Sequence, residues 1–451
     1  MRLSEIAKAL NAPMRGADVN VLSVGADSRN IAKGQLFVAI KGEHFDGNDY
    51  AAEAIKQGAA AVMLSNAKLH AAPSVVVENT RLALGELSRY WRSKFNLPLV
   101  AVTGSNGKTT VKEMISAILN AANGKVLATR GNLNNDIGMP LTLLGLNEKH
   151  TFAVIEMGMN HEGEIRYLTK IAQPNVALVN NAGTAHIGEV GSREGIARAK
   201  GEIFEGLAAG GTAVINADDD FADYWKSLNK NRKIITFGLG ANAEVSAAYQ
   251  TQNNVSNIQL KTPSGKVKFS LNVLGEHNVR NALAASAAAV VLGISNENIA
   301  SGLAQFNPVN GRLNWLQGAN GAVVIDDTYN ANPDSMKVAI DVLAKQKTVQ
   351  IFVMGDMAEL GENAPQMHAE IGAYAKHKNI DIFLSFGELS KLASAAFGQN
   401  AQHFDTLEAM LDKLRKHMRN EVTVLVKGSR FMQMERVVQA ITKEKSVMEA
   451  H

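Results

Sequence analysis

The sequence contains no cysteine. This absence excludes a disulfide-stabilised scaffold, a cysteine nucleophile, cysteine-ligated zinc and iron–sulfur clusters. Long apolar runs are also missing: the longest uncharged one, residues 281–294, is rich in alanine and shorter than the roughly 20 residues that cross a bilayer. We interpret this run as a buried core helix. Charges at Arg2 and Glu5 interrupt the apolar stretch that a signal peptide would need, which predicts a cytoplasmic protein.

Neither sign of charge dominates. The 46 Lys+Arg stand against 43 Asp+Glu, which gives a formal net charge of +3. This balance is not that of a non-specific nucleic-acid binder. With 46% hydrophobic and 20% charged residues the chain is globular, and its length corresponds to about three domains.

Short apolar runs alternate with segments that are long enough for helices. Several runs are apolar at every position, as expected for parallel strands covered on both faces. This alternation predicts α/β domains built on parallel sheets. The expected strands are residues 75–77, 99–102, 152–155, 176–179, 213–215, 323–325, 351–354, 382–384 and 422–426.

Two domain boundaries follow from the pattern. A helical segment at residues 81–94 is followed by Pro98 and a strong strand, which places the first boundary near residue 96. The turn-rich residues 307–311 mark the second. We therefore expect domains at residues 1–96, 97–311 and 312–451, with a β-rich excursion at residues 238–268.

The strongest local motif lies between an apolar strand and a helical pattern at residues 111–120. It consists of Thr103, Gly104, Ser105, Asn106, Gly107, Lys108, Thr109 and Thr110. Glycines let the backbone approach phosphate oxygens, and a helix N-terminus offers free N–H groups and partial positive charge. Lys108 is suited to neutralise the β- and γ-phosphates, and the Thr109 hydroxyl to bind Mg²⁺. The spacing of Gly104 and Gly107 is closer than in the general P-loop, so the motif is a variant of it.

A glycine-rich turn without a ligand is the alternative for this motif, and the Gly-Lys-Thr-Thr order argues against it. A second glycine pattern, residues 238–243, superficially matches a dinucleotide-binding fingerprint. The residues after it are β-rich instead of opening a helix, so we interpret the pattern as a turn.

Two polar residues follow other predicted strands. Glu156 ends the strand at residues 152–155, where a Mg²⁺ ligand is expected beside a phosphate loop. The alternative is that Glu156 caps a helical segment at residues 163–170. His186 follows the strand at residues 176–179 and would lie at the same sheet edge. For a lone histidine, a structural role and a ligand role stay open.

Lys200 stands on the apolar face of a helix expected over residues 192–207, together with Ile196, Ile203, Phe204 and Leu207. The simpler interpretation is snorkelling, with a buried stem and an ammonium that reaches water. The functional one is that burial lowers the pKa of the amine. A neutral lysine beside a metal could take up CO₂ as a carbamate and gain an anionic oxygen ligand.

These motifs together resemble the ATP-dependent Mur ligases of bacterial cell-wall synthesis, whose superfamily includes the folylpolyglutamate synthases. The resemblance is carried by the phosphate loop, Glu156, His186 and residues 199–204 and 275–281. Further stretches lie in the family's order at residues 27–29, 34–42, 46–50, 131–135, 326–333, 355–361 and 427–430. Asn48 departs from the family's Asp-Gly-His pattern.

The resemblance implies a three-domain α/β fold. A small N-terminal domain would hold a UDP-sugar, a central P-loop-type parallel-sheet domain would hold ATP, and a C-terminal Rossmann-like domain would bind the amino substrate and close over ATP. The implied activity joins D-alanyl-D-alanine to UDP-N-acetylmuramoyl-tripeptide through an acyl-phosphate and releases ADP and phosphate. No nucleic acid or membrane is implied as a partner, and we expect a monomer.

Site residues are also implied by the resemblance. One Mg²⁺ would be held by Thr109 and Glu156, and a second by His186 and a carbamylated Lys200. Besides the phosphate loop, ATP would contact Asn278, Arg312 and Asp327. The substrate-binding residues would be Ser28, Arg29, Phe37, Gly42, His44, Asp46, Gly47, Asn134, Asn135, Tyr329, Asn330, Asn332, Lys427 and Arg430.

Three rival interpretations remain. The sister ligase that adds the third amino acid is disfavoured by residues 326–333 and 355–361. A folylpolyglutamate synthase would have no use for the Asp46–Gly47 nucleotide-sugar module. A P-loop switch or motor would hydrolyse ATP without an acyl or amino substrate.

Overall fold

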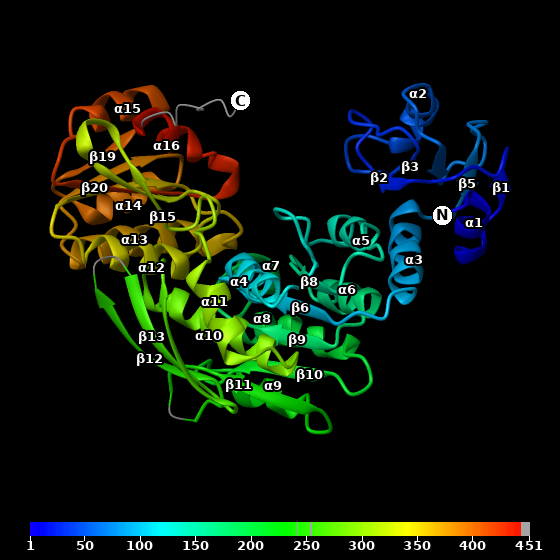
Figure 1. The fold of residues 1–451 in the computed structure, drawn as a ribbon. Coiled ribbons are helices and arrows are strands. Elements are labelled where there is room, and N and C mark those ends of the chain that lie inside the picture. Colours follow the sequence, from blue (N-terminus) through cyan, green and yellow to red (C-terminus); the bar gives the residue numbers. More distant parts are fainter. Residues whose placement is uncertain (241, 253–254, 443–451) are drawn as a thin grey trace, which may run out of the picture.

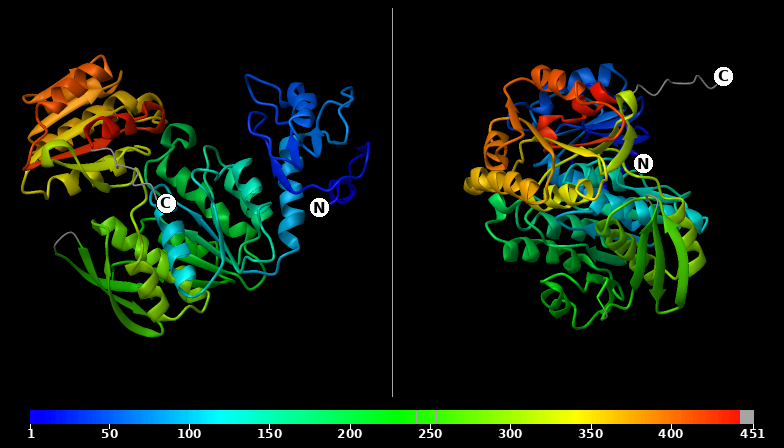
Figure 2. Two further views of the ribbon diagram at one scale, coloured as in Figure 1. Left: turned by 45° about the horizontal axis from the view of Figure 1, so that its top comes forward. Right: turned by 90° about the vertical axis from the view of Figure 1, so that its left-hand side faces the viewer.

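Four β-sheets organise the chain in the computed structural model (Figure 1). The structure describes residues 1–240, 242–252 and 255–442. The N-terminal and C-terminal sheets stand over opposite ends of the central part, and Figure 2 shows the same arrangement from two further sides. Among the described helices, none combines the length and apolarity that a membrane crossing requires. The three-domain α/β fold expected from the sequence is confirmed.

The N-terminal sheet has the order β1-β5-β4-β3-β2, and only β1 runs antiparallel to its neighbour. Leu36 and Val38 face one core and Phe37 faces another, as the alternation of a strand requires. Its elements are α1 (Leu3–Ala9), β1 (Met14–Arg15), β2 (Ser23–Gly25), β3 (Gln35–Val38), α2 (Ala51–Lys56), β4 (Ala61–Leu64), β5 (Ser74–Val76) and α3 (Thr80–Ser93).

The central sheet is fully parallel, with the order β11-β10-β9-β6-β8-β7. Val100 and Val102 enter one apolar core and Leu99 and Ala101 the other, so both faces are covered. Its strands are β6 (Leu99–Thr103), β7 (Val126–Ala128), β8 (Phe152–Glu156), β9 (Val176–Val179), β10 (Thr212–Asn216) and β11 (Lys233–Phe237). Its helices are α4 (Lys108–Ala121), α5 (Gly138–Leu143), α6 (Glu164–Ala172), α7 (Ile187–Val190), α8 (Arg193–Gly201) and α9 (Ala222–Ser227).

The β-rich excursion is an antiparallel sheet of β12 (Ser246–Gln252), β13 (Val255–Thr262) and β14 (Gly265–Leu271). No helix opens after the glycine pattern at residue 238 in the described part of the chain, which confirms a turn. The alanine-rich run lies in α10 (Glu276–Val291), which is buried over most of its length and is followed by α11 (Asn296–Ala304).

The C-terminal sheet has the order β15-β16-β20-β17-β18-β19 and is parallel except for β15. Its strands are β15 (Asn314–Gln317), β16 (Val323–Asp327), β17 (Val349–Gly355), β18 (Ile382–Phe386), β19 (Ala401–Phe404) and β20 (Val422–Lys427). Its helices are α12 (Pro333–Leu343), α13 (Ala364–His377), α14 (Ser390–Phe397), α15 (Leu407–Arg415) and α16 (Glu435–Ile441).

The helix expected over residues 192–207 is shorter in the structure. After α8 the chain tightens into a 3₁₀ helix, η2 (Glu202–Gly206). The Thr169 hydroxyl of α6 donates to the Ile203 carbonyl at 2.8 Å, and the Thr169 backbone lies so close to Gly206 that a Cβ would meet it at 2.3 Å. Contact with α6 therefore ends the regular helix.

Helix α3 joins the N-terminal part to the central part. Leu84 and Leu87 pack into the N-terminal core, while the Trp91 indole donates to the Leu146 carbonyl at 3.0 Å. The buried guanidinium of Arg92 donates to the carbonyls of Phe95, Leu97 and Ala172 at 2.5, 3.2 and 3.3 Å. These bonds hold the segment that leads into β6.

Candidate active site

A cavity of about 500 Å³ lies where the carboxyl ends of β6, β8, β9 and β16 converge. Ligands of parallel α/β sheets bind at this edge. All lining residues come from the central and C-terminal parts. Those that the sequence predicted are Ser105, Asn106, Gly107, Lys108, Thr109, Thr110, Asn134, Glu156, His186, Asn278, Arg312, Asp327, Tyr329, Asn330, Asn332, Lys427 and Arg430.

The phosphate loop is held open by asparagines. Gly107 precedes α4 with φ +80°, and a Cβ there would meet the Asn281 and Asn180 side chains at 2.3 and 2.6 Å. The Asn180 amide donates to the Asn106 carbonyl and to Asn281 Oδ1, both at 3.0 Å. Asn181 exchanges two bonds with the Asn106 backbone, at 2.9 and 3.0 Å. These hydrogen bonds fix the conformation of the loop.

Lys108 lies in this loop. Its Nζ donates to the Gly104 carbonyl at 2.7 Å. Burial lowers the pKa of Lys108, with Arg312 acting in the same direction and the Glu156 and Glu359 carboxylates opposing it. Because a helix N-terminus attracts phosphate oxygens, the ammonium of Lys108 at the start of α4 is suited to contact such a ligand.

Glu156 is 2% exposed and is held by neutral donors. The Thr109 hydroxyl donates to Oε2 at 2.8 Å, and the Asn134 amide donates to Oε1 at 2.8 Å. No ion pair neutralises this carboxylate among the described residues. A buried, unneutralised carboxylate beside a hydroxyl is suited to a hard cation such as Mg²⁺. The alternative role as a cap of α6 is wrong, because Glu202 accepts from Gly163 N and Arg166 N there.

His186 adopts φ +63° at the start of α7. Its Nδ1 lies 2.7 Å from Glu359 Oε2, and this contact draws the pKa of Glu359 below its ordinary value. Glu359 belongs to the C-terminal part and has no counterpart in the predicted site. The only signal for it was its place in residues 355–361, which carry the family resemblance.

Lys200 is 1% exposed, so its side chain does not snorkel. Burial, followed by the charge of Lys108, lowers the pKa of Lys200 well below its ordinary value. Lys200 itself does not line the cavity. A lysine in this environment is a neutral amine over a wider pH range than an exposed one.

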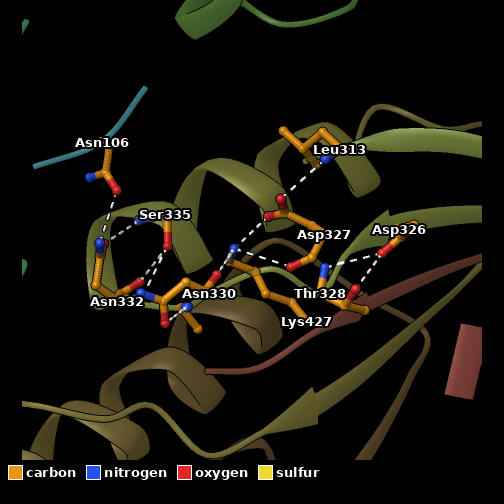
Figure 3. A network of polar contacts seen from close by, with 10 residues as sticks. Asn106, Leu313, Asp326, Asp327, Thr328, Asn330, Asn332, Ser335 and Lys427 are labelled. Carbon is orange, nitrogen blue, oxygen red and sulfur yellow. Dashed lines mark hydrogen bonds and ion pairs between the residues drawn. The ribbon is translucent and has the colours of Figure 1, made fainter. Parts of the chain in front are cut away.

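The C-terminal side of the cavity is a network around β16 and α12 (Figure 3). Lys427 is 2% exposed, forms an ion pair with Asp327 Oδ2 at 2.5 Å and donates to the Asn330 carbonyl at 2.8 Å. Asn332 caps α12 by accepting from Ser335 N and donates to Asn106 Oδ1 at 2.8 Å. Asn330, Asn332 and Lys427, which were predicted to bind substrate, therefore also fix the loop between β16 and α12.

Arg312 crosses from the C-terminal part to the phosphate loop. Its Nη2 donates to the Thr109 hydroxyl at 2.8 Å, and its guanidinium lies 4.1 Å from the centre of the Tyr329 ring. Its Nε is buried without a partner in the described structure. An unpartnered guanidinium N–H beside a phosphate loop is suited to an anionic ligand.

The predicted UDP-sugar residues do not line this cavity. Arg29 is exposed and pairs with Asp27. The Phe37 ring lies in the core, so any contact from this position would come from its backbone. Asn48 is buried, and its backbone N–H donates to Asp46 at 2.9 Å. The other predicted residues of this part are Ser28, Gly42, His44 and Gly47.

Two further side chains complete the description of the site. His277 lines the cavity, and burial lowers its pKa to about 4. It lies within residues 275–281, but its side-chain position could not be read from the sequence. Asn135 lies outside the cavity lining, and its side chain accepts from Gly138 N at the start of α5 at 2.8 Å.

A metal would need ligands beyond these side chains. No group of three or more His, Cys, Asp or Glu residues suited to a metal occurs in the described residues. The Thr109 hydroxyl and the Glu156 carboxylate fit one Mg²⁺, whose remaining ligands would have to be phosphate oxygens and water. A phosphate loop, a buried carboxylate and an arginine from a second domain define the class: an α/β enzyme that uses a nucleoside triphosphate.

The chain matches three domain families in order. These are the Mur ligase family catalytic domain at residues 20–92, the Mur ligase middle domain at residues 102–289 and the Mur ligase glutamate ligase domain at residues 311–430. It is 43% identical to the UDP-N-acetylmuramoyl-tripeptide–D-alanyl-D-alanine ligase of Haemophilus influenzae, with 97% of each chain covered.

Solved structures agree with these matches. MurF from Acinetobacter baumannii superposes with a TM-score of 0.92 at 38% identity, covering 97% of each chain. MurF ligase from Thermotoga maritima in complex with ADP gives 0.83 at 28% identity, covering 93% of this chain and 96% of that one. The chain belongs to the Mur ligase family.

Proposed function

We propose that this protein is the ATP-dependent ligase that joins D-alanyl-D-alanine to UDP-N-acetylmuramoyl-tripeptide. The products are UDP-N-acetylmuramoyl-pentapeptide, ADP and phosphate, and the reaction serves peptidoglycan synthesis and thereby cell shape and division. The observation that carries the proposal is the full-length 43% identity to the ligase of that name. Its use of ATP is supported by the phosphate loop and by the ADP complex of a relative. Such a reaction belongs in the cytoplasm, where ATP is supplied.

The first step brings two anions together. The terminal carboxylate of the tripeptide attacks the γ-phosphorus of ATP, the bond to the β-phosphate oxygen breaks, and an acyl-phosphate and ADP form. Lys108 of the central part and Arg312 of the C-terminal part are two of the basic residues that line the cavity, and Arg312 also donates to Thr109 of the phosphate loop. Because charge in a partly buried cavity is screened less than in water, their positive charge stabilises the crowded phosphoryl oxygens.

The second step forms the peptide bond. The free amine of D-alanyl-D-alanine attacks the acyl carbon, the carbon–oxygen bond to phosphate breaks, and the nitrogen loses a proton. Arg430 lines the cavity and is 60% exposed at its side chain, so it is free to exchange Glu435 for the dipeptide carboxylate. Tyr329, Asn330 and Asn332 also line the cavity and are further candidate contacts. The UDP-sugar would be held by the N-terminal residues Ser28 to Asn48.

Thr109 and Glu156 would hold one Mg²⁺, which supplies positive charge to the phosphoryl oxygens when bound. His186 and Lys200 would hold a second one, with Lys200 as the carbamate. The buried, weakly basic amine of Lys200 supports this modification, since only the neutral amine adds CO₂.

Product analysis tests the proposal. The protein is incubated with ATP, Mg²⁺, UDP-N-acetylmuramoyl-tripeptide and D-alanyl-D-alanine, and the UDP-linked product is weighed by mass spectrometry. We expect the pentapeptide, and phosphate release only when both substrates are present. Phosphate release without either substrate would favour the P-loop switch, and extension of a dipeptide precursor by one amino acid would favour the sister ligase.

A further inference from the structure

The loop between β9 and α7 is hydrogen-bonded to Asp334 of the C-terminal part, a residue without a role in the proposed ligase chemistry. Asp334 lies in the first turn of α12. Its Oδ2 accepts from Thr184 N at 2.7 Å and from the Thr184 hydroxyl at 2.9 Å. Both bonds cross from one domain to another, and a carboxylate acceptor makes them stronger than bonds between neutral groups.

The surroundings are shaped for this contact. A Cβ at Gly183 would lie 2.4 Å from Asp334 Oδ2, so only glycine allows the carboxylate to approach. Gly183 N also donates to the Ser105 hydroxyl at 2.9 Å, which ties the same loop to the phosphate loop. Asp334 thus binds a loop that is itself hydrogen-bonded to Ser105 of the phosphate loop.

His186 follows Thr184 by two residues and adopts a backbone conformation with φ +63°. The C-terminal part holds the far side of this segment as well, because Gly188 N donates to the Glu359 carbonyl at 3.2 Å. A left-handed conformation of a non-glycine residue costs energy and persists when contacts on both sides fix it. Asp334 and Glu359 provide those contacts.

Asp334 is not needed to start α12. Asn332 is the N-cap and forms a reciprocal capping box with Ser335. An acidic residue in a first turn gains a small dipole stabilisation wherever it stands. Glu408 occupies the equivalent place in α15, where Thr406 is the cap, and it is exposed. It therefore offers a matched control for a purely helical role.

We propose that Asp334 is a positioning residue for phosphoryl transfer: by binding Thr184 it couples docking of the C-terminal domain to the placement of His186 beside the phosphate loop. This inference rests on the proposed function, in which His186 serves the site. In this proposal, docking of the C-terminal domain completes the site in the central domain and also brings the amino substrate.

The test compares Asp334→Ala, Asp334→Asn and Glu408→Ala in the full chain. We expect Asp334→Ala to lower kcat at least tenfold with the KM for the UDP-substrate within twofold, because substrate contacts are untouched. Asp334→Asn keeps one acceptor oxygen and should recover part of kcat. Glu408→Ala should behave as the unmodified protein. All variants should melt within a few degrees of it.

A second readout does not depend on turnover. Small-angle scattering of the free protein should give a larger radius of gyration for Asp334→Ala than for Glu408→Ala, since a docking contact is lost. A kcat within twofold of the unmodified protein, or an equal loss in Glu408→Ala, would overturn the positioning role. An unmodified protein that forms no pentapeptide would instead refute the proposed function, while the scattering comparison would still decide the docking contact.

Discussion

Two buried ionisable side chains, Glu156 and Lys200, are central to the proposed chemistry. Glu156 accepts hydrogen bonds from the Thr109 hydroxyl and the Asn134 amide, and burial, followed by the charge of Lys108, lowers the pKa of Lys200. Burying a charge without a partner is costly, so such groups persist where a ligand or a modification completes them. The roles of these residues are proposals, and each can be tested by substitution.

Replacing Lys200 with alanine removes the amine that the carbamate needs. We expect at least about a 100-fold loss of kcat, because the proposed carbamate ligand cannot form. A small added carboxylic acid should restore part of the activity by occupying the vacated position. Lys125→Ala, an exposed lysine of the same domain, is the control. Full activity of Lys200→Ala would leave the lysine with a packing role.

The depressed pKa of His277 predicts a pH dependence of stability. Folding lowers this pKa from 6.5 to about 4. Between these values the unfolded chain binds a proton that the folded chain does not, so the contribution is complete above pH 6.5 and is lost as the pH falls toward 4. It amounts to at most about 3 kcal/mol.

Urea unfolding at pH 7.5 and 4.5 measures this effect. His277→Gln should reduce the difference in free energy of unfolding between the two pH values, since glutamine does not titrate. His161→Gln, which changes an exposed histidine, should leave the difference as it is. If the free energy of unfolding depended on pH equally in the unmodified protein and both variants, His277 would be solvated in the folded state.

At the scale of elements, the phosphate loop shows how strand, turn and helix are joined. At Gly107, with φ +80°, a Cβ would collide with Asn180 and Asn281, whereas at Gly131, with φ +54°, a Cβ would have no atom within 4 Å. An alanine in this conformation costs about 1–2 kcal/mol at either position. Only at Gly107 does it also displace the asparagines that shape the loop.

Gly107→Ala and Gly131→Ala therefore separate strain from function. Both should lower the free energy of unfolding, and Gly107→Ala should lower it more, because it adds a collision with the asparagines to the shared backbone strain. Only Gly107→Ala should also weaken ATP binding, by about tenfold or more, since 1.4 kcal/mol of displaced contacts corresponds to one order of magnitude. Isothermal titration calorimetry measures the affinity. Comparable ATP affinities in the two variants would mean that the asparagines tolerate the methyl group.

The sequence predicted the elements well where one physical rule dominated. Runs such as residues 176–179 are apolar at every position and form buried parallel strands, and β9 has the predicted bounds. The helix over residues 192–207 was wrong in its second half, because its end depends on a contact with Thr169 in α6 that is distant in sequence. Glu359 and Asp334 escaped prediction for the same reason: their partners belong to another domain.

At the scale of the whole molecule, the site is assembled from two domains. Arg312, Asn332 and Asp334 each bond to the central part, and the boundaries near residues 96 and 311 remain our proposal for where the domains divide. The N-terminal residues expected to hold the UDP-sugar line no part of the cavity. We therefore expect the N-terminal domain and the cavity to approach each other when the substrate that bridges them binds.

Scattering measures this approach. Adding ATP and UDP-N-acetylmuramoyl-tripeptide together should reduce the radius of gyration, because the shared substrate bridges the N-terminal domain and the cavity. Either compound alone should cause a smaller change. An unchanged radius with both present would mean that the tripeptide reaches the cavity without any domain movement.

The three carbonyls bound by Arg92 limit how that approach can occur. A flexible linker between the two parts would allow many orientations of the N-terminal domain. Because Arg92 binds the segment before β6 and the Ala172 carbonyl of α6, the C-terminal end of α3 is fixed to the central part. We therefore expect the N-terminal domain to approach the cavity through fewer orientations than a flexible linker would allow.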